Sequence, residues 1–113
     1  AEYLQIPAEK FHLVPLTIDC DKHTGTPKAN LHEPPTIGYF ARICPEKGLD
    51  RLVEACLRLR QRGMRFRLVA AGYLAPERKA WLDSVRRQAA PLGADFKYAG
   101  SPATHADKVS FLN

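Results

Sequence analysis

Arg42 and Lys47 are two cations, separated by four residues, at a predicted crossover from strand to helix. An apolar, aromatic run typical of a strand ends just before Arg42, and Lys47 opens an amphipathic pattern typical of a helix. An arginine fork holds a phosphate at two points, a lysine adds a compact charge, and a helix N-terminus attracts anions. The spacing therefore favours a phosphate or diphosphate site. The alternative is two solvated surface charges, with Glu46 offsetting Lys47.

Hydrophobic periodicity predicts the elements that would position this pair. Residues 36–43 and 65–71 are apolar runs typical of strands buried on both faces of a parallel sheet, and residues 95–99 resemble a third, shorter strand. Between the strands, residues 46–62 and 76–90 carry apolar residues at a spacing of three to four, which is typical of helices. The order strand, helix, strand, helix, strand predicts an α/β fold built of βαβ units on a parallel sheet.

The two ends of the chain have weaker patterns. Residues 1–9 resemble the tail of a helix that a proline breaks, and residues 11–16 resemble a short edge strand. Residues 17–35 contain Gly25, Asn30 and three prolines, Pro27, Pro34 and Pro35, a composition that predicts a loop or linker. Thr104 is placed to cap a last short helix over residues 105–112.

Length and composition predict one small globular domain. The chain has 113 residues, of which 45% are hydrophobic and 26% charged, so it can form a core and is not of disordered composition. Its apolar runs are too short for a membrane span, and no signal peptide opens the chain, so we expect a cytoplasmic location. Because the chain begins at Ala1 and its only methionine is Met64, we expect a piece of a longer polypeptide.

The net charge of +5 is spread over the two predicted helices, which indicates solvated polar faces. The helical cations include Arg58, Arg60, Arg62, Arg78, Lys79, Arg86 and Arg87. A nucleic-acid surface would interleave such cations with exposed aromatic residues or Gly-rich loops, and the sequence lacks that arrangement, so no nucleic-acid partner is expected. Attraction to an anionic membrane surface stays open.

Cysteine usage predicts free thiols in a reducing compartment, because the count is odd, the spacing is wide and no CxxC occurs. The cysteines are Cys20, Cys44 and Cys56, and Cys56 falls on the apolar face of a predicted helix. The group Cys20, His23, His32 and Glu33 fits no zinc spacing, so no metal site is predicted. No G-x-G-x-x-G run follows a strand and no Walker A run occurs, which disfavours dinucleotide oxidoreductases and NTPases.

The run Ala41-Arg-Ile-Cys-Pro-Glu-Lys-Gly-Leu-Asp-Arg-Leu52 resembles the group 1, or family 4, glycosyltransferases of the GT-B fold. Their pattern is a strand, Gly-Arg, four residues, Lys-Gly and an amphipathic helix. The upstream residues 6–19 resemble the family's interdomain segment, and residues 68–72 and 96–100 match its second and third strands. The resemblance thus covers nearly the whole chain.

The resemblance implies a Rossmann-like parallel sheet with flanking helices, here an incomplete half with three βα units of a C-terminal GT-B domain. Residues 1–35 would be the interdomain strand and linker, and residues 36–113 the first half of the nucleotide-sugar-binding domain. In a retaining glycosyltransferase, Arg42 and Lys47 would grip the donor diphosphate without a metal or other cofactor. The implied residues of the nucleotide cleft are Ala41, Gly48, Gly72, Tyr98, Gly100 and Ser101.

The sequence departs from the family pattern in three places. Ala41 replaces the usual glycine before the arginine, and Leu16-Thr17 replaces Asn-Gly in the interdomain segment. The chain stops before the family's Glu-x7-Glu element, and the N-terminal acceptor domain is missing. The implied partners are therefore a nucleotide-sugar donor, an acceptor domain and the remainder of the C-terminal domain, and we expect the fragment alone to be inactive.

The sequence leaves two further questions open, namely what pairs with the free edge of the sheet and whether the chain belongs to an enzyme. In a sheet of order 3-2-1-4-5-6, this chain supplies only the 3-2-1 half, so the strand at residues 36–43 would keep one unpaired edge. Such an edge predicts a dimer through that strand, or a patch formed by residues 11–16. The alternative function is a non-catalytic α/β binding module whose basic helices, through Arg86 and Arg87, meet an anionic partner.

Overall fold

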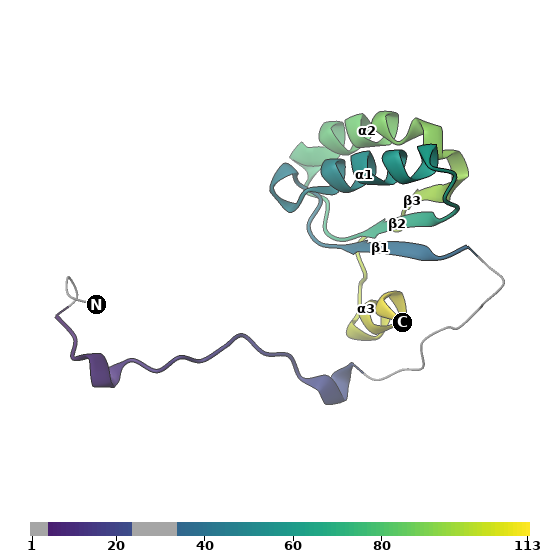
Figure 1. Ribbon diagram of the computed structural model, residues 1–113. Coiled ribbons are helices and arrows are strands. Elements are labelled where there is room, and N and C mark those ends of the chain that lie inside the picture. The colour runs from purple at the N-terminus through teal and green to yellow at the C-terminus, as the bar shows by residue number, and fades with distance from the viewer. Residues whose placement is uncertain (1–4, 24–33) are drawn as a thin grey trace.

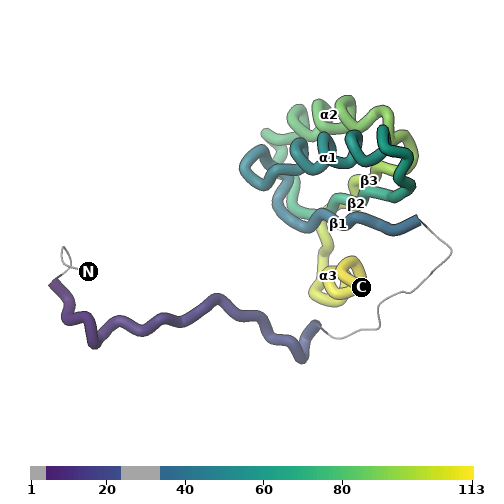
Figure 2. The backbone as a smooth tube through the Cα atoms, in the orientation of Figure 1, coloured from purple at the N-terminus to yellow at the C-terminus, as the bar shows by residue number. Residues whose placement is uncertain are grey.

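The computed structural model describes residues 5–23 and 34–113, and its core is a three-stranded parallel sheet flanked by helices (Figures 1 and 2). The strands are β1 (Thr36–Phe40), β2 (Arg67–Ala71) and β3 (Phe96–Tyr98). The helices are α1 (Leu49–Gln61), α2 (Lys79–Gln88) and α3 (His105–Leu112). The predicted α/β class, with a Rossmann-like parallel sheet and flanking helices, is confirmed.

The sheet has the order β1-β2-β3, and both pairs of strands are parallel. Thr36 lies beside Arg67 and Phe40 beside Ala71, while Tyr98 lies beside Ala70 in the next strand. The carboxyl ends of all three strands therefore meet at one edge of the sheet. Within the described part of the chain β1 has a neighbour on one side only, as the 3-2-1 order predicts.

One face of the sheet carries the hydrophobic core and is covered by α1 and α2, which lie together on that side (Figure 1). The strand residues of this face alternate along the chain, as a pleated strand requires. They are Ile37, Tyr39, Leu68, Ala70, Phe96 and Tyr98. The helices contribute Leu49, Val53, Leu82 and Val85, each of them at most 2% exposed.

Among the described residues, α3 alone covers the opposite face, which is thinly packed (Figure 1). The Phe111 ring lies 5.6 Å from the Phe40 ring, measured between centroids, and it also covers Gly38. Phe40 nevertheless stays 39% exposed. The prediction that residues 36–43 are buried on both faces is therefore wrong, because the one helix on this side has no buried residue of its own.

The α1 helix begins later than its pattern predicts. Residues 45–47 form a 3₁₀ turn, and Gly48 then adopts a left-handed conformation with φ of 76° before α1 begins at Leu49. The prediction of a helix over residues 46–62 is thus wrong in its first turn, since a left-handed residue cannot continue an α-helix. The end is as predicted, because Gly63, with φ of 81°, follows the last turn.

The second helix, predicted over residues 76–90, also begins later than its pattern predicts. A 3₁₀ turn over residues 76–78, with Pro76 in its first turn, leads into α2. The last helix, α3, is confirmed over residues 105–112, and Thr104 caps it in a reciprocal capping box with Asp107. No helix in residues 5–23 and 34–113 has the length and apolar character needed to cross a membrane.

The described N-terminal segment, residues 5–23, contains no strand, so the prediction of an edge strand at residues 11–16 is wrong. Leu13, Val14 and Leu16 are 95%, 81% and 103% exposed. A short apolar run forms a strand only where a neighbouring strand pairs with it, and within the described residues this run has none, so residues 11–16 do not patch β1. A dimer through the β1 edge stays a prediction.

The rest of this segment forms two short turns. The helical tail predicted for residues 1–9 is absent from its described part, where a 3₁₀ turn begins at Ala8 instead. Of the predicted loop at residues 17–35, residues 24–33 lie outside the described residues, and residues 20–22 form another 3₁₀ turn. His105, at the start of α3, contacts this turn, since its Nε2 lies 2.6 Å from the Lys22 carbonyl oxygen.

Candidate functional site

The backbone after β1 continues to pair with the backbone after β2, and this places the candidate site. The Ala41 N–H donates to the Ala71 carbonyl at 3.2 Å, and the Ile43 N–H donates to the Tyr73 carbonyl at 2.8 Å. Arg42 lies between these two bonds, at the carboxyl end of β1. In parallel α/β sheets ligands bind beyond this end of the strands.

Arg42 has a fixed backbone and a free side chain. The Tyr39 hydroxyl donates a hydrogen bond of 2.9 Å to the Arg42 carbonyl oxygen. The next residue, Ile43, is only 1% exposed and anchors the chain in the core. Burial raises the pKa of Tyr39, so this hydroxyl stays protonated and keeps its donor role at neutral pH. The Arg42 side chain itself is exposed and available to a ligand.

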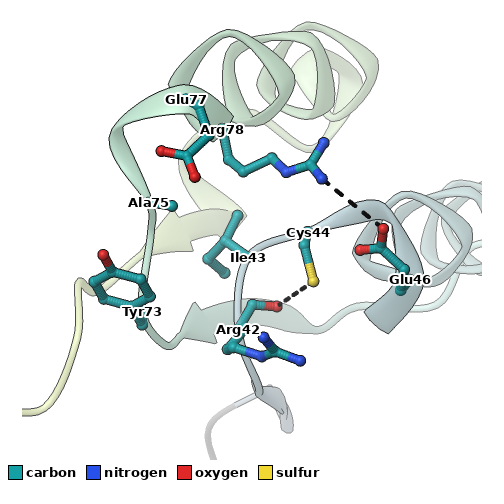
Figure 3. Close-up of a pocket in the computed structure, with 8 residues that line it drawn as sticks. All are labelled: Arg42, Ile43, Cys44, Glu46, Tyr73, Ala75, Glu77 and Arg78. Atoms are coloured by element: carbon teal, nitrogen blue, oxygen red, sulfur yellow. Dashed lines mark hydrogen bonds and ion pairs between the residues drawn. The ribbon is translucent and has the colours of Figure 1, made fainter.

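A cavity of about 310 Å³ opens beside Arg42, between the chain that follows β1 and the chain that follows β2 (Figure 3). Its lining residues are Arg42, Ile43, Cys44, Glu46, Tyr73, Ala75, Glu77 and Arg78. Of the residues that the sequence predicts for a site, this lining contains Arg42 and no other. The cavity is of the size that a small ligand occupies.

Two guanidinium groups and a carboxylate control the electrostatics of this cavity. The Arg78 guanidinium lies 3.9 Å from the Glu46 carboxylate, and the two side chains are 42% and 69% exposed. The pKa of Glu46 lies below its ordinary value, chiefly because its own backbone N–H donates to the carboxylate. The Cys44 thiol is close by, but its hydrogen bond goes to the Arg42 carbonyl oxygen at 3.8 Å. The positive charges of Arg78 and Arg42 lower that pKa further, so the carboxylate is ionised at neutral pH.

Lys47 lies next to this cavity in sequence but is not part of its lining. Its backbone N–H donates to the Cys44 carbonyl at 3.2 Å, within the 3₁₀ turn that precedes α1. The side chain is exposed, and none of the ion pairs in residues 5–23 and 34–113 involves it. Glu46 therefore pairs with Arg78 rather than offsetting Lys47, contrary to the second interpretation of the sequence.

Gly72 joins the carboxyl ends of the three strands. Its φ of 148° is open only to glycine, and a Cβ at this position would lie 1.7 Å from the Ala41 carbonyl oxygen. Its N–H donates to the Gly100 carbonyl at 3.0 Å, and its own carbonyl accepts from the Tyr98 hydroxyl at 2.7 Å. Gly72 thus allows β1 and β2 to approach closely, and this packing role does not depend on a ligand.

Three further residues predicted for the nucleotide cleft, Tyr98, Gly100 and Ser101, lie at or just after β3, whereas Ala41 follows β1 and Gly48 precedes α1. Tyr98 is half-buried, and burial raises its pKa while the Arg86 guanidinium, 6.0 Å from the ring centre, opposes that rise. Gly100 adopts a left-handed φ of 83°, and Ser101 follows it on the surface. Tyr98 and Gly100 are hydrogen-bonded to Gly72, and neither these residues nor Ser101 line the cavity at Arg42.

The sequence analysis missed the part of the cavity that follows β2. Tyr73, Glu77 and Arg78 come from this segment, and Arg78 was assigned to a solvated helix face. The rule that strand ends meet at one edge could have found them, because the chain after β2 must run beside the chain after β1.

The cation Arg60 is not solvated as predicted either. Its guanidinium donates to the Asp95 carboxylate at 3.1 Å and to the Phe66 carbonyl at 3.0 Å. It also lies 4.8 Å from the centre of the Phe66 ring. Arg60 therefore links α1 to the residues just before β2 and β3, and it is not part of a free basic surface.

The cysteines are free in the structure, and Cys56 is buried in the core as predicted. Burial raises the pKa of its thiol, which fits a packing role. In the described residues no three His, Cys, Asp or Glu side chains come together as metal ligands. His32 and Glu33, named with Cys20 and His23 in the sequence analysis, lie outside the described residues.

Comparison with known proteins gives one partial similarity. Over 67 residues the chain is 36% identical to the amylovoran biosynthesis glycosyltransferase AmsK of Erwinia amylovora. The match covers 59% of this chain and 16% of that protein. No family model and no solved structure matches the chain. The chain thus combines a distant, partial similarity to a glycosyltransferase with a parallel α/β sheet.

Proposed function

We propose that this chain is the donor-binding part of a retaining glycosyltransferase of the GT-B fold, in which Arg42 and Lys47 bind the diphosphate of a nucleotide sugar. The observation that carries the proposal is the position of Arg42, at the carboxyl end of β1 and on a cavity of about 310 Å³. The partial similarity to AmsK, a glycosyltransferase by name, supports the same class of reaction.

The chemistry of sugar transfer explains why cations are needed here. Negative charge grows on the leaving diphosphate as the glycosidic bond breaks, and cations fixed beforehand stabilise that charge most in the transition state. The Arg42 backbone is fixed by the Tyr39 hydroxyl on one side and by buried Ile43 on the other. Only the arginine side chain has to be ordered when a donor binds.

Lys47 and the start of α1 add to this arrangement. Gly48 turns the chain so that α1 begins directly after Lys47, and no side chain caps the first turn of the helix. The first N–H groups of a helix carry a partial positive charge and bind phosphate oxygens. Lys47 supplies a second full charge beside them, without a metal.

In this proposal the chain forms one part of a complete enzyme. A nucleotide-sugar donor would bind here, while an acceptor domain and the rest of the C-terminal domain would complete the site. The isolated chain should then bind a nucleoside diphosphate and transfer little or no sugar.

Calorimetric titration of the chain with UDP and with GDP tests the proposal. Replacing Arg42 and Lys47 together by alanine should weaken binding by about 2–5 kcal/mol, because each hydrogen bond to a charged group contributes about 1.5–3 kcal/mol. The matched control is Arg86→Ala with Arg87→Ala, which removes the same charge from the exposed end of α2. If the control pair weakens binding more than the first pair, the chain is instead a binding module that meets anions through its basic helix.

A further inference from the structure

We infer that Arg78 is a third cation of the anion site and that Glu46 is its built-in counter-ion, which an incoming diphosphate displaces. The inference rests on the proposed function and extends it to two residues that no sequence pattern assigns. Arg78 comes from the turn before α2, whereas Arg42 follows β1, and the two line the same cavity. A diphosphate held between them would bridge the two βα units.

The position of Glu46 supports this role. Figure 3 shows the Arg78 side chain extended toward the Glu46 carboxylate, and the distance between their charged groups is 3.9 Å. Arg42 acts on the same carboxylate, since its charge also lowers the pKa of Glu46. Glu46 thus offsets the charge of Arg78 directly and that of Arg42 more weakly.

The Glu46–Arg78 pair is easily opened. At 3.9 Å the contact is an ion pair without a hydrogen bond, and both side chains are substantially exposed. Exposed pairs of this kind contribute little net stability, so the protein loses little when a ligand separates them. A diphosphate supplies more negative charge and more acceptor oxygens than the carboxylate, and it can satisfy the forked donors of both arginines.

Glu46 cannot stay in place once a diphosphate is bound, because two anions would then face each other across the cavity. The carboxylate is therefore a competitor for the ligand, and removing its charge should increase affinity. Glu77 gives a matched comparison, since it lines the same cavity but forms no ion pair in the described part of the chain.

The experiment is calorimetric titration of the chain with inorganic pyrophosphate at low and at high salt. Glu46→Gln should tighten binding about two- to fivefold at low salt, the range expected for an exposed ion pair. The gain should shrink at high salt, where exposed charges are screened. Glu77→Gln should change the affinity less. Arg78→Gln should weaken binding about tenfold, as for a lost hydrogen bond to a charged group.

A double variant separates competition for Arg78 from a general charge effect. If Glu46 acts through Arg78, Glu46→Gln should give no more than a small gain when Arg78→Gln is already present. Melting curves of each variant should match the wild type, because both side chains lie on the surface.

Three results overturn the inference. Equal gains for Glu46→Gln and Glu77→Gln would show a general charge effect. Binding that depends on Arg42 but is unchanged by Glu46→Gln and Arg78→Gln would leave the proposed function and remove this inference. If neither the wild type nor Glu46→Gln binds pyrophosphate, the proposed function fails and the inference fails with it.

Discussion

The two faces of the sheet differ sharply in how they are packed. Toward α1 and α2, the strands present residues such as Leu68 and Ala70 that are 0% exposed. Toward α3, the main contact is the Phe111 ring against Phe40 and Gly38. Lys97 on β3 points to that thinly covered side by alternation and is exposed.

This difference shows which layer stabilises the chain and on which side the candidate site lies. Parallel sheets normally bury both faces under helices, and here one face has a full layer while the other has one short helix. The candidate site uses the well-packed side, since its lining residues come from the connections that lead into α1 and α2. A stable layer thus holds Arg42 and Arg78 in place.

The largest effect should come from truncating the packed face. Leu68→Ala leaves a cavity in the core and should lower the free energy of unfolding by about 2–5 kcal/mol. Phe111→Ala should cost only about 0.5–1.5 kcal/mol, the usual contribution of an aromatic pair. Urea denaturation of both variants measures the difference. Equal losses, or a larger loss for Phe111→Ala, would contradict the contrast between the faces.

Two glycines should respond in opposite ways to the same change. Gly72→Ala forces a Cβ against the Ala41 carbonyl oxygen, 1.7 Å away, and should destabilise the protein by about 1–3 kcal/mol through overpacking. Gly38→Ala places its Cβ 3.7 Å from the Phe111 ring, an ordinary contact, and should stabilise the strand by about 0.5–1 kcal/mol. Thermal unfolding of the two variants tests this pair, and a stable Gly72→Ala protein would show that β1 and β2 need no such close approach.

The smallest effect concerns alkaline pH and Tyr39, which reaches from the packed face to the Arg42 carbonyl. Burial, followed by the charges of Cys44 and Asp50, raises the pKa of Tyr39 above 10.0 in the folded state. The folded state therefore retains this proton more strongly than the unfolded state. The corresponding stability is fully present below pH 10 and is lost as the pH rises through the raised pKa.

Tyr39→Phe should remove this part of the pH dependence. The measurement is the free energy of unfolding between pH 8 and pH 11, with Tyr73→Phe as the control, since Tyr73 is 58% exposed. Parallel curves for the wild type and Tyr39→Phe would contradict a buried, hydrogen-bonded hydroxyl at this position.

The sequence predicts the central layer well, because its signals are local and agree with one another. The apolar spacing from Leu49 to Leu59 and the glycine at position 63 predict the body and the end of α1. The Thr104 cap likewise predicts α3. These features depend on nearest neighbours along the chain, and tertiary contacts do not overrule them.

What the sequence did not predict depends on contacts between distant segments. Residues 11–16 have the apolar composition of a short strand, but a strand needs a partner, and the pattern does not say whether one exists. The contribution of Arg78 follows only when the connection after β2 is laid beside that after β1. The later start of α1 follows from the left-handed Gly48, which a helical pattern of side chains does not reveal.

The most direct test of the proposed diphosphate site is a map of amide resonances of the isotopically labelled chain during titration with UDP. The account predicts that the largest shifts fall on residues 42–49 and 73–78, at the carboxyl edge of the sheet, and that Arg42→Ala abolishes them. Shifts confined to the end of α2 around Arg86 and Arg87, with Arg42→Ala without effect, would contradict it.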